Sequence, residues 1–388
     1  MPQTATASEL MERVRALAPV FGKRAAAGEE ARQIPPESAR DMLEAGVARI
    51  LMPKRFGGYE LDFDTWLDVV LELARTDASH AWCASLFVHH AHLIAQFPEE
   101  CQQAVWKDGP DVPIAASFAP RALAVRAAGG YRVSGKDSSF SSGVGHAAWV
   151  MVGAMTQGDE TPEWKFFMIP PGQFAIRDTW QTAAMRGTGS NTIVTDDVFV
   201  PDSRVLSLAD LRPGKGPGGA VNANPLYRVP FFFYAPLTFT APMLGAVQGA
   251  YTAFVDGTKT RRAVDGSLVA EKTGVQVRLA RTAADIDAAG LLLRRTARAH
   301  EVAANEIEAS LARSIRDFSR VSELSVSAAD ELLAMSGTAG FASSSPIQRV
   351  WRDVHFAASH ISVNPELNYA HYGRIEFGLG RDPARPFF

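Results

Sequence analysis

Three histidines lie within one short apolar stretch, LFVHHAHLIAQF, at His89, His90 and His92. Because residues three apart share one face of a helix, His89 and His92 are expected on a common face, with His90 beside it. An imidazole titrates near neutral pH and can exchange a proton with a reacting group, or it can ligate a metal. No third ligand stands at a useful metal-site spacing. Acid–base chemistry and ordinary core hydrogen bonding are therefore the two interpretations left open.

Two other stretches carry groups that could do chemistry. His360 lies in RDVHFAASHISVN, and Ser142 lies in the serine-rich run KDSSFSSGVGHAAWV. The glycine-punctuated run AMRGTGSNTIVTDDVFVP sets the hydroxyls of Thr188 and Ser190 beside glycines that allow the backbone to approach a ligand closely. A structural histidine and two surface turns are the alternatives. By composition alone the last run is a surface hairpin loop, with a turn or bulge expected at Asp196 and Asp197.

Amino-acid composition limits the class of protein to which these histidines and hydroxyl residues can belong. The chain has 388 residues, of which 47% are hydrophobic and 21% charged, as in an ordinary globular protein of two or three domains. A net charge of −3 gives no excess of basic residues with which to bind nucleic acid. Two cysteines without a CxxC pairing argue against a disulfide framework and favour a reducing compartment. The N-terminal run has no apolar signal region, so we expect a cytoplasmic protein without a membrane partner.

Hydrophobic periodicity divides the chain into regions. Residues 1–110 have helical spacing, and residues 111–210 contain short β-rich runs separated by turn signals. Residues 211–228 are rich in glycine and proline and are expected to form a loop or linker. Four long helical stretches follow in residues 229–388, the last from Ile347 to Gly378, which suggests a four-helix bundle.

The segment MRGTGSN and its trailing strand DVFVP resemble a signature of the flavin monooxygenases built on the acyl-CoA dehydrogenase fold. The turn PKRFGG, which begins at Pro53, is similar to a turn common in the same family. The resemblance covers nearly the whole chain. It implies an α+β architecture: an N-terminal helical domain, a middle antiparallel β barrel or sandwich and a C-terminal four-helix bundle. It also implies a homotetramer.

A true acyl-CoA dehydrogenase needs a carboxylate base, commonly nine residues after the arginine of an Arg-Asp pair. Here that pair is Arg352-Asp353, and the position nine residues onward is Ile361, which cannot take a proton. Glu366 and Glu376 lie outside the motif and are interpreted as solvent-facing or ion-pair residues. Dehydrogenation is disfavoured, although a base displaced to another position stays an alternative.

The resemblance implies roles for particular residues. Ser142 matches a serine that hydrogen-bonds flavin N5, and His360 matches a histidine that faces substrate and flavin. A histidine of the apolar stretch is expected to approach the substrate hydroxyl, His92 in first place and His89 in second. Ser117, Phe118, Thr188 and Ser190 are expected to contact the flavin, and Arg261 and Arg262 its phosphate. Phe233 and Tyr234, in the aromatic run PFFFYAPLTF, are expected to line the substrate pocket.

The implied activity is that of an oxygenase component. It would take reduced flavin, FMNH2 or FADH2, as a diffusible co-substrate from a separate NAD(P)H:flavin reductase. With O2 and a C4a-hydroperoxyflavin it would hydroxylate an aromatic or phenolic small molecule, without a metal. The alternatives are an acyl-CoA dehydrogenase or oxidase with a displaced base, an N-oxygenase of an amino sugar, and a non-catalytic protein that keeps only the fold.

Overall fold

The computed structural model describes residues 5–382, which fall into two compact units. Residues 1–4 and 383–388, at the outer ends of the first and last expected domains, lie outside the described residues. We call the two units the β unit and the bundle unit. The β unit comprises Met1–Val69, Trp82–Thr182 and Arg186–Phe231, and the bundle unit comprises Val70–Ala81, Ala183–Met185 and Phe232–Phe388.

The helices at the start of the chain have clear local causes. Helix α1 (Ala7–Ala31) begins at a capping box in which the Thr6 hydroxyl accepts from the Glu9 N–H, and the Glu9 carboxylate accepts from the Thr6 N–H. Helix α2 (Pro36–Glu44) starts with a proline, whose missing N–H is not needed there. The remaining helices of this region are α3 (Phe63–Ala74), α4 (Ala78–Ile94) and α5 (Glu99–Trp106). The helices expected from periodicity are all present.

The β unit contains one seven-stranded sheet with the order β5-β6-β2-β1-β3-β4-β7. Strands β1 and β3 pair in parallel and the other neighbours pair antiparallel, so the sheet is mixed. Its inner face buries a core of small and β-branched residues that includes Val133, Val152 and Ile193. The strand bounds are β1 Ile114–Ala127, β2 Gly130–Ser141, β3 Trp149–Gln157, β4 Trp164–Ile169, β5 Ala175–Arg177, β6 Asn191–Pro201 and β7 Val205–Ser207.

Irregularities bend this sheet where candidate residues lie. The register of β1 against β3 shifts between Ser117 and Ala122. At the shift only a glycine fits opposite, because a Cβ on Gly153 would stand 2.1 Å from the Phe118 carbonyl oxygen. The bulge expected near Asp196 is confirmed by a register shift between β2 and β6 and by a φ of 47° at Asp197.

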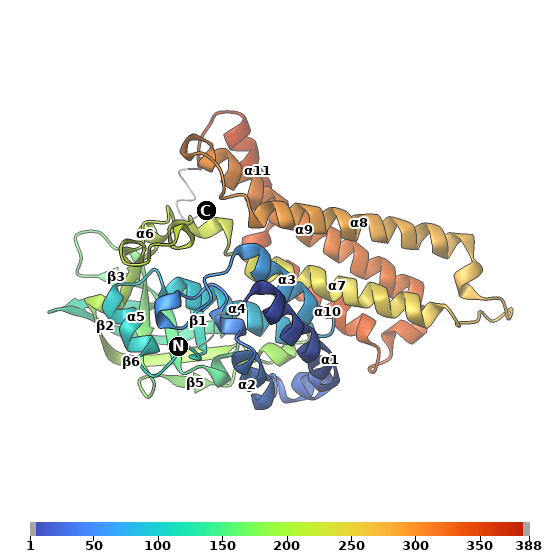
Figure 1. The fold of residues 1–388 in the computed structure, drawn as a ribbon, viewed down its shortest axis with the longest axis horizontal. Coiled ribbons are helices and arrows are strands. Elements are labelled where there is room, and N and C mark those ends of the chain that lie inside the picture. Colours follow the sequence, from blue (N-terminus) through green and yellow to red (C-terminus); the bar gives the residue numbers. More distant parts are fainter. Residues whose placement is uncertain (1–4, 383–388) are drawn as a thin grey trace. The chain divides into compact units, whose positions relative to one another are not determined.

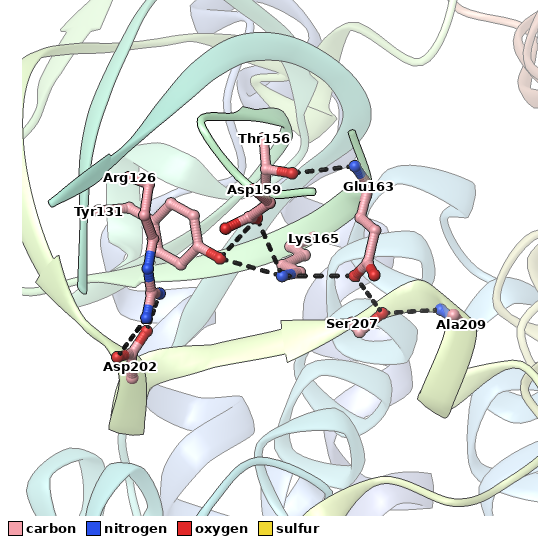
Figure 2. A network of polar contacts seen from close by, with 9 residues as sticks. All are labelled: Arg126, Tyr131, Thr156, Asp159, Glu163, Lys165, Asp202, Ser207 and Ala209. Atoms are coloured by element: carbon pink, nitrogen blue, oxygen red, sulfur yellow. Dashed lines mark hydrogen bonds and ion pairs between the residues drawn. The ribbon is translucent and has the colours of Figure 1, made fainter. Parts of the chain in front are cut away.

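A network of charged side chains ties strands of this sheet together (Figure 2). The Lys165 ammonium donates to the Tyr131 hydroxyl at 3.0 Å and pairs with Asp159 and Glu163, each at 3.3 Å. The Tyr131 hydroxyl donates to Asp159 at 2.8 Å. Arg126 lies over the Tyr131 ring, 4.7 Å from its centroid. Strands β1, β2 and β4 and the turn after β3 are thereby joined through polar contacts.

The bundle unit is built around helix α9 (Ile307–Ser336), which packs against each of the other long helices (Figure 1). Those helices are α7 (Leu237–Thr258), α8 (Thr273–Ala297), α10 (Pro346–Ala358) and α11 (Pro365–Glu376). Helix α7 also approaches the end of α3 so closely that a Cβ on Gly249 would stand 2.0 Å from the Arg75 carbonyl oxygen. The long helices that the apolar spacing predicts therefore pack together as the expected bundle.

The last helical stretch differs from its expected continuous form. Helix α10 ends at Ala358, a short 3-10 turn covers Ile361–Val363, and α11 begins at Pro365. Proline disfavours helical backbone at the residue before it, and the Asn364 side chain instead caps α11 by accepting from the Leu367 N–H. As a result, His360 lies in a loop between two helices.

Within residues 5–382, no helix is both long and apolar enough to span a bilayer. No three His, Cys, Asp or Glu side chains in the same range converge as metal ligands.

Candidate active site

Four side chains of the β unit form a chain of hydrogen bonds through Ser142. The Trp82 indole N–H donates to Ser142 Oγ at 3.1 Å, and Ser142 Oγ lies 2.7 Å from Ser190 Oγ. Ser190 Oγ in turn lies 2.7 Å from Thr188 Oγ1. All four side chains are buried. Three residues expected from the sequence to contact one ligand are thus brought together as neutral hydroxyls.

Local backbone geometry explains how the two loops meet. The Gly143 N–H donates to the Thr188 carbonyl at 2.7 Å, which pins the end of β2 to the loop before β6. Gly143 has a φ of 71° and Gly189 a φ of 54°, values that favour glycine. These backbone angles explain why a glycine stands directly after Ser142 and between Thr188 and Ser190.

His89 is surrounded by aromatic rings of the β unit. Its ring is nearly parallel to that of Phe118, at 4° and 5.9 Å between centroids, and stacks on Phe231 at 5.9 Å and on Trp66 at 6.0 Å. Burial, together with the nearby His90 and His92, holds the pKa of His89 well below its usual range. A neutral imidazole among flat apolar rings suits an aromatic ligand.

His90 has a defined tautomer. Its Nδ1 lies 2.6 Å from the Ile114 carbonyl oxygen, which can only accept, so Nδ1 carries the proton and Nε2 is an acceptor. No described residue hydrogen-bonds this buried Nε2 atom. Burial lowers the pKa of His90 to about 4, although the bond to Ile114 acts in the opposite direction. His90 is therefore a neutral imidazole with an open acceptor, and its ring centroid is 6.0 Å from that of Phe118.

His92 has different surroundings. Its Nε2 lies 3.0 Å from the Leu226 carbonyl oxygen and therefore donates to it. The ring packs on Tyr227 at 5.8 Å and edge-on against Phe63 at 5.6 Å. These contacts tie α4 to the segment around Leu226, and the role of His92 in catalysis stays a prediction.

Ser117 and Phe118 lie at the irregular part of β1. The buried Ser117 hydroxyl donates to the Ser139 carbonyl at 2.9 Å. The Phe118 ring contacts both His89 and His90, and packs edge-on against Phe166 at 5.2 Å. Phe118 therefore belongs to the histidine cluster, whereas Ser117 links β1 to β2.

His360 lies in the bundle unit, where its Nδ1 accepts from the Ser362 N–H at 3.2 Å and lies 2.7 Å from Ser362 Oγ. Its ring stacks on Phe239, with 3.8 Å between centroids. The side chain keeps some exposed surface, yet burial lowers the pKa of His360 to about 4. His360 is therefore a neutral imidazole whose orientation is set by Ser362 and Phe239.

The other candidates of the bundle unit have clear packing contacts. Phe233 and Tyr234 are fully buried. Arg261 donates to the Met335 and Ser336 carbonyls at the end of α9, and Arg262 donates to the Gly266 carbonyl. Each guanidinium has five N–H groups, so these bonds leave room for a phosphate contact, which stays a prediction.

The three positions considered for the base of a dehydrogenase are all exposed to solvent. Ile361 opens the 3-10 turn after α10 and is 49% exposed. Glu366 and Glu376 are exposed, as expected of solvent-facing carboxylates. None of these three residues supplies a buried carboxylate near the loop of His360.

Comparison with known proteins defines the class of this fold. The family model described as "Acyl-CoA dehydrogenase, N-terminal domain" matches residues 4–108, and the one described as "Acyl-CoA dehydrogenase, C-terminal domain" matches residues 237–365. The expected order of helical region, β sheet and helical bundle is confirmed.

Individual relatives narrow the class. The oxygenase subunit HsaA of a flavin-dependent monooxygenase from Rhodococcus jostii (strain RHA1) is 37% identical over 95% of this chain and 98% of its own length. The oxygenase component of a FADH2-dependent resorcinol hydroxylase from Rhizobium sp. (strain MTP-10005) is 36% identical over 97% and 96%. The structure of XiaF from Streptomyces sp. in complex with FADH2 and glycerol superposes with a TM-score of 0.90 at 32% identity, covering 98% of this chain and 97% of that one. The chain belongs to the oxygenase subunits of flavin-dependent monooxygenases.

The β unit offers groups that fit a flavin. A flavin ring edge carries nitrogen and oxygen atoms that need small neutral partners, and the buried chain supplies the hydroxyls of Ser142, Ser190 and Thr188, the first of which is held by the Trp82 N–H. Sequence reasoning did not select His90 as a site residue. The signal that identifies it, its bond to Ile114, exists only in the folded chain.

Proposed function

We propose that this protein is the oxygenase component that hydroxylates a phenolic ring, with FADH2 delivered by a separate NAD(P)H:flavin reductase. The observation that carries the proposal is the buried, neutral His90 with its open Nε2 acceptor beside the Phe118 ring. Relatives named for resorcinol and p-hydroxyphenylacetate hydroxylation support a phenol as substrate. The name of the resorcinol hydroxylase and the ligand of XiaF support FADH2 over FMNH2.

The proposed hydroxylation has the stoichiometry of a monooxygenase. One atom of O2 enters the ring in place of hydrogen, and the other leaves as water. The reduced flavin, when bound, supplies the two electrons and two protons that this requires and activates O2. The protein must hold flavin and substrate together and exclude water.

His90 would receive the substrate hydroxyl. Because its proton is on Nδ1, its Nε2 can accept a hydrogen bond from a phenol O–H, and this bond makes the ring more electron-rich. His89 and Phe118, whose rings are nearly parallel, would contact the flat face of the substrate. The residues thereby select a ring that carries a hydroxyl.

Ser142 would donate to the flavin. Its Oγ already accepts from Trp82, and its own proton is free for a ligand only if Ser190 donates to it. Thr188 next to Ser190 allows the chain of hydroxyls to run in that direction. Thr188 and Ser190 would therefore orient the donor at Ser142 as well as contact the flavin.

We also propose the finer features implied by the family. Arg261 and Arg262 would contact the flavin phosphates, His360 would contact the reacting groups, and the protein would assemble as a homotetramer. A cytoplasmic location suits the two cysteines, Cys83 and Cys101, which are buried and form no disulfide.

The test combines the purified protein with a flavin reductase, NADH, FAD and a set of phenols under ¹⁸O2. Mass spectrometry should find one ¹⁸O atom in the product, and peroxide release should be low for the best phenol. Repeating the reaction with FMN should give a lower yield of product per NADH. Only peroxide with every phenol, or bleaching of bound FAD by acyl-CoA esters, would contradict the proposal and favour a dehydrogenase.

A further inference from the structure

The loop between α10 and α11 holds His360 through the residue two positions later. The Ser362 N–H donates to His360 Nδ1 at 3.2 Å, so the histidine side chain caps the turn Ile361–Val363. The Ser362 hydroxyl oxygen lies 2.7 Å from the same nitrogen. The backbone N–H and the hydroxyl of Ser362 therefore both lie at hydrogen-bond distance from His360 Nδ1.

This contact determines where the imidazole proton lies. A backbone N–H can only donate, so Nδ1 must present its lone pair and cannot carry a proton in the neutral ring. The Ser362 hydroxyl then donates to the same lone pair. Since a neutral imidazole has one N–H, the proton of His360 is on Nε2.

The serine is itself held in place by neighbouring helices. The Asn368 amide of α11 donates to the Ser362 carbonyl at 2.9 Å and to Ser319 Oγ of α9 at 2.8 Å. Ser319 donates to the Val363 carbonyl at 3.0 Å. Asn368 and Ser319 are buried, and the face of the His360 ring rests on Phe239. The two residues that follow Ile361 are therefore anchored to α9 and α11, and the histidine ring is held against Phe239.

We propose that Ser362 is a positioning residue that fixes His360 as the Nε2–H tautomer, so that His360 serves the reaction as a hydrogen-bond donor and not as a base. The inference rests on the proposed monooxygenase function and adds a direction to it. His90 has its proton on Nδ1 and accepts, whereas His360 has its proton on Nε2 and donates. Burial, which keeps the pKa of His360 low, maintains the neutral ring that this role needs.

The first experiment is a nitrogen NMR spectrum of the full-length protein with ¹⁵N-labelled histidine side chains. The His360 signals are assigned from the spectrum of His360→Asn. Signals from a protonated Nε2 and an unprotonated Nδ1 are expected near neutral pH. A protonated Nδ1 in an enzyme that hydroxylates a phenol would overturn the donor role alone. An Nε2–H tautomer in a protein that hydroxylates no phenol would overturn the donor role together with the proposed function.

The second experiment asks what the Ser362 hydroxyl contributes. Ser362→Ala keeps the backbone N–H, so the Nε2–H tautomer should remain, but the ring loses its closer partner and the product formed per O2 consumed should fall about fivefold, as expected for one lost hydrogen bond. Ser362→Thr, which keeps the hydroxyl, should restore the yield. Ser359→Ala is the matched control, because the exposed Ser359 hydroxyl donates to Phe356 and does not contact the histidine. A native yield from Ser362→Ala, or a protonated Nδ1 in that variant, would contradict the positioning role.

Discussion

The charged network around Lys165 and the histidine cluster around His90 are two polar regions of the same unit, and they differ in how fully their groups are paired. In the network, the Lys165 ammonium has three oxygen partners and each carboxylate has a donor (Figure 2). In the cluster, the Ile114 carbonyl satisfies one nitrogen of His90, and no described residue satisfies the other. The polar groups of the first region are paired with one another, whereas the second region contains a buried acceptor that no described residue pairs.

The pKa values of Lys165 and His90 reflect the same difference in pairing. Burial alone would lower the pKa of Lys165, but the hydrogen bond to Tyr131 and the attraction of Glu163 and Asp159 outweigh it and raise that pKa. At His90 burial prevails and the pKa falls to about 4. A saturated charged cluster therefore contributes to stability, while a neutral histidine with an open nitrogen is suited to bind a hydroxyl.

The largest expected effect is at His90. In His90→Asn the amide can still donate to the Ile114 carbonyl, as Nδ1 does, but the acceptor at Nε2 is lost. We expect product formation to fall about a hundredfold, a typical contribution of a positioned acid–base group. The assay is ¹⁸O incorporation at saturating FADH2. The control is His146→Gln, in which the amide replaces an Nε2 that contacts the Ile34 carbonyl at 3.0 Å, and which should keep native turnover.

A smaller effect is expected at Ser142. Ser142→Ala removes the terminal hydroxyl of the chain and should lower product per O2 about tenfold, with a matching rise in peroxide. Ser141→Ala is the neighbouring control, since the Ser141 hydroxyl bonds only weakly, at 3.4 Å, to the Ser138 carbonyl. Equal yields from the two variants would remove Ser142 from the site.

Lys165→Met should affect stability and leave catalysis intact. The change leaves Asp159 and Glu163 without their shared cation, and we expect unfolding free energy to fall by about 1–2 kcal/mol in urea titrations. The control variant Lys136→Met, at an exposed lysine, should change the free energy of unfolding little. A Lys165 variant that lost turnover but kept its stability would erase the distinction between the two regions.

The last prediction concerns pH. The pKa of His90 is about 4 in the folded protein, against an ordinary value of 6.5, so below pH 6.5 the unfolded chain binds the proton first. Stability should therefore fall as the pH drops from 6.5 to 4. Urea titrations across this range should show a shallower decline in His90→Asn than in the native protein. Parallel curves would mean that His90 is not neutral in the fold.

Much of the architecture could be predicted from sequence, because its signals are local. The capping residues of α1, the β-branched runs of the sheet and the glycines around Thr188 each specify their own surroundings. The break between α10 and α11 also has a local cause at Pro365, but the apolar spacing on both sides concealed it. The parallel pairing of β1 with β3 depends on contacts across the sheet and has no such signal.

The choice among the three neighbouring histidines could not be made from sequence. His90 and His92 have the same chemistry, and what separates them is a carbonyl supplied by a distant part of the chain. For His90 this is Ile114 and for His92 it is Leu226, 134 residues away. The predicted residues Ser142, Thr188 and Ser190 do lie together, because a hydrogen bond from Gly143 to Thr188 joins their loops directly.

The central claim is that the open nitrogen of His90 accepts the hydroxyl of a phenol. The most direct test is to compare the dissociation constants of a phenol substrate and of its methyl ether for the native protein and for His90→Asn. The native protein should bind the phenol about tenfold more tightly than the ether, as one hydrogen bond to a buried acceptor predicts, and the variant should bind both alike. A variant that keeps the native preference for the phenol would contradict the claim.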